Sequence, residues 1–355
     1  MNEDYLGLEE FGNIDVKDAF FDSLRENYKG FDEWFFRKAA DGEKAYVSVS
    51  SGKKINAFLY LKTEKGSVSD IYPKLEEGKH LKVGTFKINA HFTATGNRFM
   101  AIILRKFVAE DFDDVYVTMF PETPGLPNLF GRFGFHKYGT KQTESGNEDV
   151  LIRNKADRGD IYADFPRFDL SGGKYLLGIN PKFHTKMVPD SRLNTERDFV
   201  REDVSPANSV VKTYLTSMRG VAGLNHGDKM VLYRTKDEGR IAEYSSVATS
   251  ICVVDEVRNI NSFESEQDFL NFANRGSIFS TDELHGFWMS KKYSQVIRFL
   301  YNLPLKKRIT RHELLSGGIL EANKRNQYFG FFKMTDREFR AILKAGEVNE
   351  NFVIN

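Results

Sequence analysis

The sequence predicts a mixed α+β protein with two domains, and three observations lead to this expectation. The chain has 355 residues, which is too long for one ordinary hydrophobic core. Hydrophobic residues make up 41% of the chain and charged residues 28%, as in soluble globular proteins. Segments whose apolar residues recur at helical spacing alternate with short runs of alternating or β-branched residues, which are typical of strands.

Composition also excludes several classes of protein. No apolar run approaches the roughly 18 residues that a membrane span needs, and the acidic start MNEDYLGLEE is unlike a secretory signal. The single cysteine, Cys252, excludes an intrachain disulfide, fits a reducing cytoplasm and is expected to be a buried structural thiol. The net charge is +1, so charge alone does not indicate nucleic-acid binding.

The first elements are expected to be helices and then a hairpin. Residues 16–40 carry apolar side chains at helical spacing, which predicts one or two amphipathic helices with a break at Gly30. Two strands are expected next, over Ala45–Val49 and Ile55–Leu61, joined by a turn. The following residues, Lys62–Leu75, are interpreted as a charged connection of low apolar content.

The stretch from Thr85 to Phe135 is the most informative part of the chain. Its expected elements are a strand ending near Asn89, a loop carrying Thr95-Gly96-Asn97-Arg98, an amphipathic helix, the strand Asp114–Phe120, and a short helix ending in Arg132-Phe133-Gly134-Phe135. The start of a helix has unpaired N–H groups and a positive dipole end. A strand–loop–helix unit of this kind therefore predicts a site for an anion.

The order of these elements resembles the GNAT superfamily of acetyl-CoA-dependent N-acetyltransferases. In that family the loop reads roughly Arg/Gln-x-x-Gly-x-Gly/Ala and wraps the pyrophosphate of coenzyme A. Here residues 93–98 read TATGNR, so that Gly96 matches while Thr93 and Arg98 depart from the pattern. The resemblance implies that residues 1–155 form a GNAT-like mixed sheet flanked by helices, which binds acetyl-CoA as cosubstrate.

The same resemblance implies which residues hold acetyl-CoA. Backbone groups at the end of the strand would bond the pantetheine arm, and amides at the helix start would hold the pyrophosphate. The side chain of Arg98 could add a charge-assisted contact. The implied cofactor-binding residues are Ile88, Asn89, Ala90, Thr95, Gly96, Asn97, Arg98 and Phe99.

The catalytic group is less clear. Many GNAT enzymes have a tyrosine four residues before the glycine of the Gly-Phe ending, and this tyrosine protonates the leaving thiolate. The corresponding residue here is Phe130, so another group acts, the thiolate leaves unaided, or catalysis has been lost. Among candidate catalytic residues, His91 has a near-neutral pKa that suits a general base, with Glu122 and Tyr138 as further candidates.

The second half begins after a predicted linker at residues 156–172, which is rich in Gly, Pro and Asp. Expected strands are Tyr175–Asn180, Lys229–Arg234, Ser245–Val257 and Leu300–Leu305, and expected helices are Ser205–Val221, Ser265–Asn274, Thr281–Met289 and Thr335–Ala345. This pattern of strands resembles the PUA-like superfamily, particularly ASCH and EVE domains. The resemblance implies that residues 173–355 form a PUA-like β-barrel with helices, which reads RNA or modified nucleobases.

Candidate nucleic-acid contacts follow from this second resemblance and from a basic cluster. Polar groups at the ends of the loop Thr235–Tyr244 would face the ligand, and five basic residues crowd residues 306–312. The candidates are Arg234, Tyr244, Ser245, Lys306, Lys307, Arg308 and Arg311. The scattered histidines and the single cysteine show no metal-ligand spacing, and no metal is expected.

Two functions remain open at this point. One is an acetyltransferase whose second domain recruits RNA, with an acceptor amine on a base, on a charged tRNA or on a protein. An enzyme that modifies charged tRNA would act as a growth-arresting toxin. The other is a catalytically degenerate regulator that senses acetyl-CoA or a modified base. Neither hypothesis specifies an oligomeric state.

Overall fold

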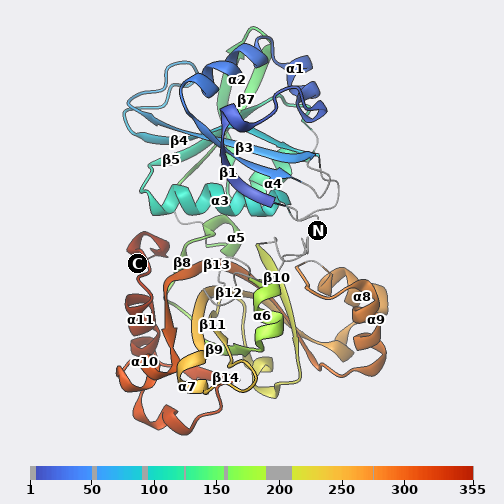
Figure 1. The fold of residues 1–355 in the computed structure, drawn as a ribbon, viewed down its shortest axis with the longest axis vertical. Coiled ribbons are helices and arrows are strands. Elements are labelled where there is room, and N and C mark those ends of the chain that lie inside the picture. The colour runs from blue at the N-terminus through green and yellow to red at the C-terminus, as the bar shows by residue number, and fades with distance from the viewer. Residues whose placement is uncertain are drawn as a thin grey trace. The chain divides into compact units, whose positions relative to one another are not determined.

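The computed structural model describes residues 5–49, 54–89, 95–123, 125–155, 159–188, 210–274 and 276–354. The chain divides into two compact units, a first that extends to Arg158 and a second that begins at Gly159 (Figure 1). We call them unit 1 and unit 2. Within the described ranges, no helix is both long enough and apolar enough to cross a membrane.

Unit 1 is built on one seven-stranded sheet. Its strands are β1 (Tyr5–Glu10), β2 (Lys44–Val49), β3 (Ile55–Lys65), β4 (Lys79–Ile88), β5 (Asp114–Met119), β6 (His136–Thr143) and β7 (Gly146–Asn154). Their order in the sheet is β1-β2-β3-β4-β5-β7-β6. All neighbours are antiparallel except β4 and β5, because these two strands are joined by a crossover helix rather than by a hairpin.

Helices cover both faces of this sheet (Figure 1). One face carries α1 (Asp22–Asn27), α2 (Phe31–Ala40) and the short turns η1 (Phe11–Asn13) and η2 (Ala19–Phe21), and the other carries α3 (Thr95–Ala109) and α4 (Leu126–Arg132). The predicted break at Gly30 is confirmed, since this residue precedes α2 with a φ of 74°. Phenylalanine rings fill the space under α2. The ring centroid of Phe11 lies 4.8 Å from that of Phe35 and 5.6 Å from that of Phe58.

The predicted charged connection after β3 is only partly charged surface. Its first residues extend β3 to Lys65, and three apolar residues of the loop that follows are buried: Val68, Ile71 and Leu75. They pack against Tyr116 and Val150 in a small second core. The segment has few apolar residues, as interpreted from the sequence, but the three that are buried are enough to fasten the loop to the sheet.

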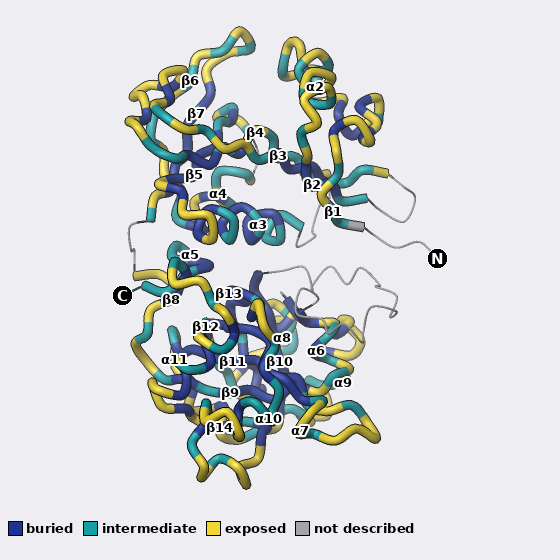
Figure 2. The backbone as a smooth tube through the Cα atoms, turned by 60° about the vertical axis from the view of Figure 1, so that its left-hand side comes forward, coloured by how far each residue is buried: buried dark blue, intermediate teal, exposed yellow. Residues whose placement is uncertain are grey.

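Unit 2 contains a six-stranded sheet in the order β10-β13-β12-β11-β9-β14. These strands are β9 (Lys174–Ile179), β10 (Val211–Thr216), β11 (Lys229–Arg234), β12 (Val247–Asn259), β13 (Gln295–Thr310) and β14 (Phe331–Met334), and a separate pair joins β8 (Phe168–Asp169) to β15 (Val353–Ile354). Figure 2 shows β11 and β12 buried along most of their length. In the described part of the chain β10 and β14 do not pair, so the sheet is open and the expected closed barrel is not found.

The helices of unit 2 connect and cover these strands. They are α5 (Ile161–Asp164), α6 (Pro181–Met187), α7 (Ala242–Ser245), α8 (Glu266–Ala273), α9 (Thr281–Ser290), α10 (Arg311–Ser316) and α11 (Asp336–Ala345), with short turns η6 (Arg219–Gly223), η7 (Ile260–Ser262), η8 (Ala322–Asn326) and η9 (Glu350–Phe352). The last helix, α11, begins with a capping box that Thr335 and Glu338 form. The predicted linker at 156–172 includes α5 and β8, which belong to unit 2.

The expected helix over Ser205–Val221 was wrong for its described residues from 211 to 216. Val211–Thr216 form β10, which pairs with β13 and is buried at every position. Residues 205–209 lie outside the described residues. The run VVKTYLT is rich in β-branched and aromatic residues, and pairing with a long strand outweighs its helical spacing of apolar residues.

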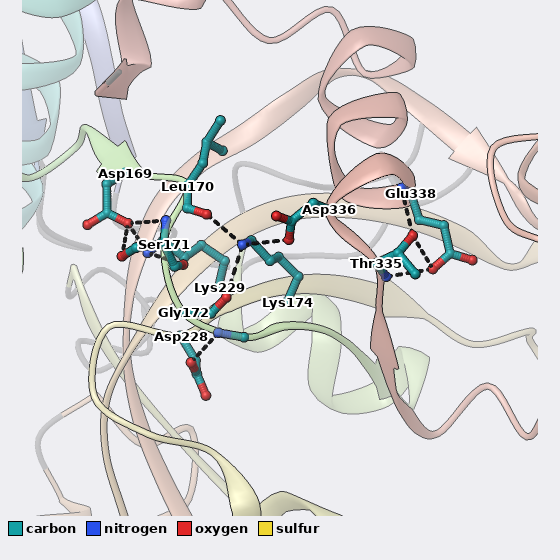
Figure 3. Close-up of polar contacts among 11 residues, drawn as sticks. Asp169, Leu170, Ser171, Gly172, Lys174, Asp228, Lys229, Thr335, Asp336 and Glu338 are labelled. Atoms are coloured by element: carbon teal, nitrogen blue, oxygen red, sulfur yellow. Dashed lines mark hydrogen bonds and ion pairs between the residues drawn. The ribbon is translucent and has the colours of Figure 1, made fainter.

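A network of lysines fixes the turn that leads into β9 (Figure 3). Lys174 donates hydrogen bonds to the carbonyls of Leu170 and Gly172, at 2.5 and 2.9 Å, and pairs with Asp336 at 2.8 Å. Lys229 pairs with Asp169. Both lysine side chains are buried, so the network replaces their hydration with carbonyl and carboxylate oxygens.

We expect Lys229→Met to lower the free energy of unfolding of unit 2 by about 1.5 kcal/mol. The substitution keeps the length of the buried side chain but removes the charged donor that Asp169 and the Ser171 carbonyl share. Because the Asp169 side chain is half exposed, water can replace part of the lost contact. Urea unfolding measures the change, and Lys236→Met, at an exposed position, is the control. Equal stabilities of the two variants would contradict the prediction.

Candidate functional site

The central parallel strands of unit 1 part at their carboxyl ends. Paired residues run from His80↔Asp114 to Val83↔Val117 and go no further within the described residues, although β4 continues to Ile88. Exposed Gly84 is the first residue past the last pair, and a Cβ there would meet the ring of Tyr60 at 2.7 Å. The end of β4 therefore has backbone groups on its β5 side that no described strand satisfies.

The register shows which side chains line each face at this opening. Phe86 and Ile88 pair with Leu59 and Ala57 of β3 and lie on the face covered by α3 and α4. Phe86 contacts the rings of Phe99 at 5.8 Å and of Phe130 at 5.4 Å. Thr85 and Lys87 point to the opposite face, where the Lys87 ammonium donates to Ser23 Oγ at 2.6 Å.

The start of α3 lies against the end of β4. A Cβ on Gly96 would lie 3.5 Å from Ile88 Cδ1 and 3.2 Å from Leu129 Cδ2 in α4. The first N–H groups of a helix have no partner within the helix, and the start of a helix is therefore a common position for a bound anion. The structure thus brings together the described members of the predicted cofactor set: Ile88, Asn89, Thr95, Gly96, Asn97, Arg98 and Phe99.

Two members of this set are restricted in how they could act. The N–H of Asn89 donates to the carbonyl of Asn56 at 2.9 Å and is used within the sheet. The side chain of Phe99 is fully buried in the core, so only its backbone could face a ligand. Ala90, His91 and Thr93 lie outside the described residues.

Of the predicted catalytic residues, the structure describes Glu122 and Tyr138 and does not bring these two together. Glu122 lies in the exposed turn after β5. Tyr138 lies on β6, which β7 separates from β5, and its hydroxyl donates to the Lys74 carbonyl at 2.9 Å. Phe130 is fully buried, with its ring 4.8 Å from that of Phe135, and it acts as core.

Sequence reasoning missed a polar residue at this end of the sheet. Glu148 of β7 is only 4% exposed, and it lies one position beyond the pair Met119↔Asp149 at the end of β5. Burial, followed by the charge and hydrogen bonding of Glu148, raises the pKa of the Tyr28 hydroxyl. A lone glutamate next to a Ser-Gly-Asn turn has no local pattern that could mark it as buried.

In unit 2, polar side chains gather where β9 and β11 end and β12 begins. His184 of α6 is fully buried, and its Nε2 lies 2.8 Å from Thr249 Oγ1. Burial first, and then the positive charges of Arg234 and Arg308, lower the pKa of His184 to about 3. The imidazole is therefore neutral at physiological pH.

A bulge in β13 explains why Arg308 reaches this cluster. Ala248 pairs with Ile309, but Ser250 pairs with Pro304, so four residues of β13 lie opposite Thr249 alone. The extra length bends the strand at this point. Arg234 forms two hydrogen bonds with Asp237, at 2.7 and 3.0 Å, which hold its guanidinium.

The other predicted nucleic-acid contacts separate into two groups. Tyr244 is 63% exposed and stacks on His312 at 5.4 Å, while Arg311 lies over the ring of Phe329 at 4.3 Å. Ser245 donates to the Ile241 carbonyl within α7. By contrast, Lys306 pairs with Glu347 at 3.7 Å and Lys307 with Glu313 at 3.1 Å. The acidic partners lie on α10 and just after the end of α11.

Within the described residues, no group of three or more His, Cys, Asp or Glu side chains could hold a metal ion. Cys252 is fully buried, as expected of a structural thiol.

Comparisons with known proteins find likeness in structure only. No known protein family matches the chain, and no curated protein matches its sequence. The match to a chain of the NatC complex, bound to a Gag peptide and CoA, covers 42% of this chain and 98% of the NatC chain. The sequence identity is 13% and the TM-score is 0.30. The match to Naa50 of Arabidopsis thaliana, bound to a CoA bisubstrate analogue, covers 42% of this chain and 98% of the Naa50 chain, with 14% sequence identity and a TM-score of 0.29. The match to a variant of the spermidine N-acetyltransferase SpeG of Vibrio cholerae covers 44% of this chain and 95% of the SpeG chain, with 14% sequence identity and a TM-score of 0.30. Similarity at this level supports no statement about what this chain binds or modifies.

Proposed function

We propose that the chain is an acetyl-CoA-dependent N-acetyltransferase whose second unit, a PUA-like domain of the ASCH or EVE type, recruits an RNA or another nucleic-acid-linked substrate. The observation that carries the first part is the parting of β4 from β5 beside the start of α3. The opening between the strands exposes backbone groups to a pantetheine arm, and the helix start offers N–H groups to a pyrophosphate.

The reaction in this proposal is direct transfer. The acceptor amine attacks the thioester carbonyl while both substrates are bound, so positioning supplies much of the rate enhancement. A backbone N–H of β4 stabilises the oxygen of the tetrahedral intermediate. The thiolate of coenzyme A then leaves, taking up a proton from solvent because Phe130 has none to give.

The proposed role of unit 2 rests on the exposed ring of Tyr244 in α7 and on the partly buried Arg311 in α10. Tyr244 offers a stacking surface, and Arg311 lies on the neighbouring helix. Aromatic rings beside cations are the groups that single-stranded RNA binds. RNA or tRNA is therefore the proposed partner, and an acceptor carried by tRNA would make the protein toxic when it is not controlled.

Incubation with labelled acetyl-CoA and a cell extract tests the whole proposal. We expect stable label that ribonuclease removes. Label that only protease removes would redirect the proposal to protein acceptors. Binding of acetyl-CoA without any transfer would favour the second candidate, a sensor that has lost catalysis, for which the buried Phe130 in place of a tyrosine is the specific observation.

We expect Tyr244→Ala to weaken binding of an unstructured oligoribonucleotide about tenfold, because stacking of one base on an aromatic ring contributes roughly 1–3 kcal/mol. Fluorescence anisotropy at several salt concentrations measures this. The control is Phe36→Ala, which removes an aromatic side chain of unit 1 that is 57% exposed. A similar loss in both variants, or in neither, would contradict a site at Tyr244.

A further inference from the structure

The last helix of unit 2 presents a row of positive charges to solvent. Three exposed cations of α11 recur at spacings of three and four residues, so that they lie along one face of the helix: Arg337, Arg340 and Lys344. The ten residues of α11 span about 15 Å, and the opposite face of the helix is buried in unit 2. We call the exposed row the basic face of α11.

More cations lie next to the start of this helix. The ammonium of Lys324 donates to the carbonyl oxygen of Lys333 at 2.8 Å, which fixes η8 against β14. The side chain of Lys333 is itself exposed, and so is that of Arg325 in η8. Residues 324–344 thus carry six cations and two acids, in a chain whose net charge is only +1.

Neither acid of this segment neutralises the basic face. The carboxylate of Asp336 pairs with buried Lys174 at 2.8 Å (Figure 3), and Glu338 is fully buried, where it caps the helix. Among the described residues, no acid lies within ion-pair distance of the three cations of the basic face. Arg340 and Lys344 are four residues apart, and like charges at this spacing destabilise a helix. An anionic partner would compensate this repulsion.

The chemistry of the basic face favours a nucleic acid over a folded protein as this partner. None of the large exposed apolar side chains of the described chain belongs to α11, whereas the centre of a protein interface is usually apolar and depleted in lysine. Guanidinium groups bind phosphate oxygens through paired hydrogen bonds, and a nucleic-acid strand repeats its negative charge at every nucleotide. A row of cations therefore matches a row of phosphates.

We propose that the basic face of α11 binds the phosphate backbone of the RNA that unit 2 recruits. Phosphate contacts position a nucleic acid without reading its sequence, so this face fixes where the strand lies and other groups read its bases. The ligand of unit 2 is then a polynucleotide rather than a free modified base. This inference rests on the proposed recruitment of RNA and adds the surface that holds the backbone.

The basic face is connected to the proposed stacking site. The N–H of Lys307 in β13 donates to the carbonyl of Gly346, just after α11, at 3.2 Å. From there β13 leads directly to Arg311, the first residue of α10. The side chains of Lys306 and Lys307 are mostly exposed, and their ion pairs with acids are of the surface kind, which contributes little to stability. A phosphate can therefore replace the acid at either lysine.

Fluorescence anisotropy with the full-length protein and labelled oligouridylate, at several salt concentrations, tests the inference. The variant Arg337→Gln/Lys344→Gln removes two charges of the basic face. We expect about tenfold weaker binding at low salt, and a plot of log affinity against log salt that is less steep by about 1.4, because each contact to a single strand contributes about 0.7. Labelled oligoadenylate should show the same loss, since the contacts are not specific for sequence.

The matched control is Arg37→Gln/Lys17→Gln, which removes two exposed charges from unit 1 and should change neither value. Tyr244→Ala should weaken binding without changing the salt dependence, because stacking on a ring releases no counterions. Both double variants should unfold at the same temperature as the unmodified protein, so that lost binding does not reflect lost folding.

The outcomes separate the inference from the proposed function. An Arg337→Gln/Lys344→Gln variant that binds oligouridylate with unchanged affinity and salt dependence overturns the inference alone. Tighter binding of labelled poly-glutamate than of oligouridylate would assign the basic face to an acidic protein and would also overturn the inference. Absence of RNA binding by the unmodified protein overturns the proposed recruitment itself.

Discussion

Gly96→Glu is expected to weaken the binding of acetyl-CoA at least 100-fold, which corresponds to about 2.7 kcal/mol. The new side chain would start in the narrow space between Ile88 and Leu129, at the first turn of α3. Its carboxylate would then lie where the pyrophosphate is expected, and like charges repel. Isothermal titration with acetyl-CoA measures the loss of affinity.

Two companion variants make this result specific. Gly96→Ala places a Cβ 3.2 Å from a methyl group of Leu129, the end of a flexible side chain, so we expect only a few-fold loss. Gly12→Glu adds the same charge to unit 1 at a position with no atom within 4 Å of a new Cβ, and should bind normally. Tight binding by Gly96→Glu would show that the start of α3 does not hold the cofactor.

Asp114→Asn is expected to lower the free energy of unfolding of unit 1 by about 3 kcal/mol, the cost typical of breaking a buried ion pair. His80 is 2% exposed, and its Nδ1 lies 2.8 Å from Asp114 Oδ2. Its Nε2 lies 2.9 Å from the carbonyl oxygen of Gly66. Since that oxygen can only accept, Nε2 carries a proton, and the carboxylate favours a second proton on Nδ1.

The same pair makes the stability of unit 1 depend on pH. Burial alone would lower the pKa of His80, but the Asp114 carboxylate and the carbonyls of Gly66 and Glu76 raise it more, so the net shift is upward from 6.5. The stabilisation is therefore complete below pH 6.5 and is lost as the pH rises through the folded-state pKa.

Urea unfolding between pH 6 and 9 checks both parts of this prediction. The unmodified protein should lose stability as the pH rises through this range, and Asp114→Asn should be less stable at pH 6 and depend less on pH. His136→Asn changes an exposed histidine of the same unit and should retain the full pH dependence. The prediction fails if Asp114→Asn and the unmodified protein unfold at the same urea concentration at pH 6.

Many elements of unit 1 could be predicted from local patterns because their patterns are long or have a clear boundary. The helix α3 has seven buried residues at helical spacing over fifteen positions. In the segment 16–40, Gly30 has a left-handed conformation and marks the boundary before α2. The helix expected over Ser205–Val221 was wrong because its pattern is short and ambiguous. The apolar residues of Val211–Thr216 fit both the spacing of a helix and that of a strand, and only pairing with the distant β13 decides between the two.

The candidate sites divide in the same way. A glycine before a helical run was enough to indicate where an anion could bind, because the unpaired N–H groups of a helix start are a local property. The burial of Glu148 could not be predicted, since it depends on a tyrosine 120 positions earlier and on the end of β5. Likewise, the ion pairs of Lys306 with Glu347 and of Lys307 with Glu313 join residues of different elements, and no local pattern shows them.

By itself, then, the sequence predicted the helices of unit 1, its strands β2 to β5 with their order along the chain, and the position of the start of α3, but not β1. Only the tertiary structure decided that β4 and β5 part beyond Val83, that β10 is a strand and that Glu148 is buried. The physical reason is the separation along the chain of the residues on which each property depends. Backbone conformation follows from neighbours along the chain, whereas strand pairing, burial and charge compensation depend on residues that folding alone brings together.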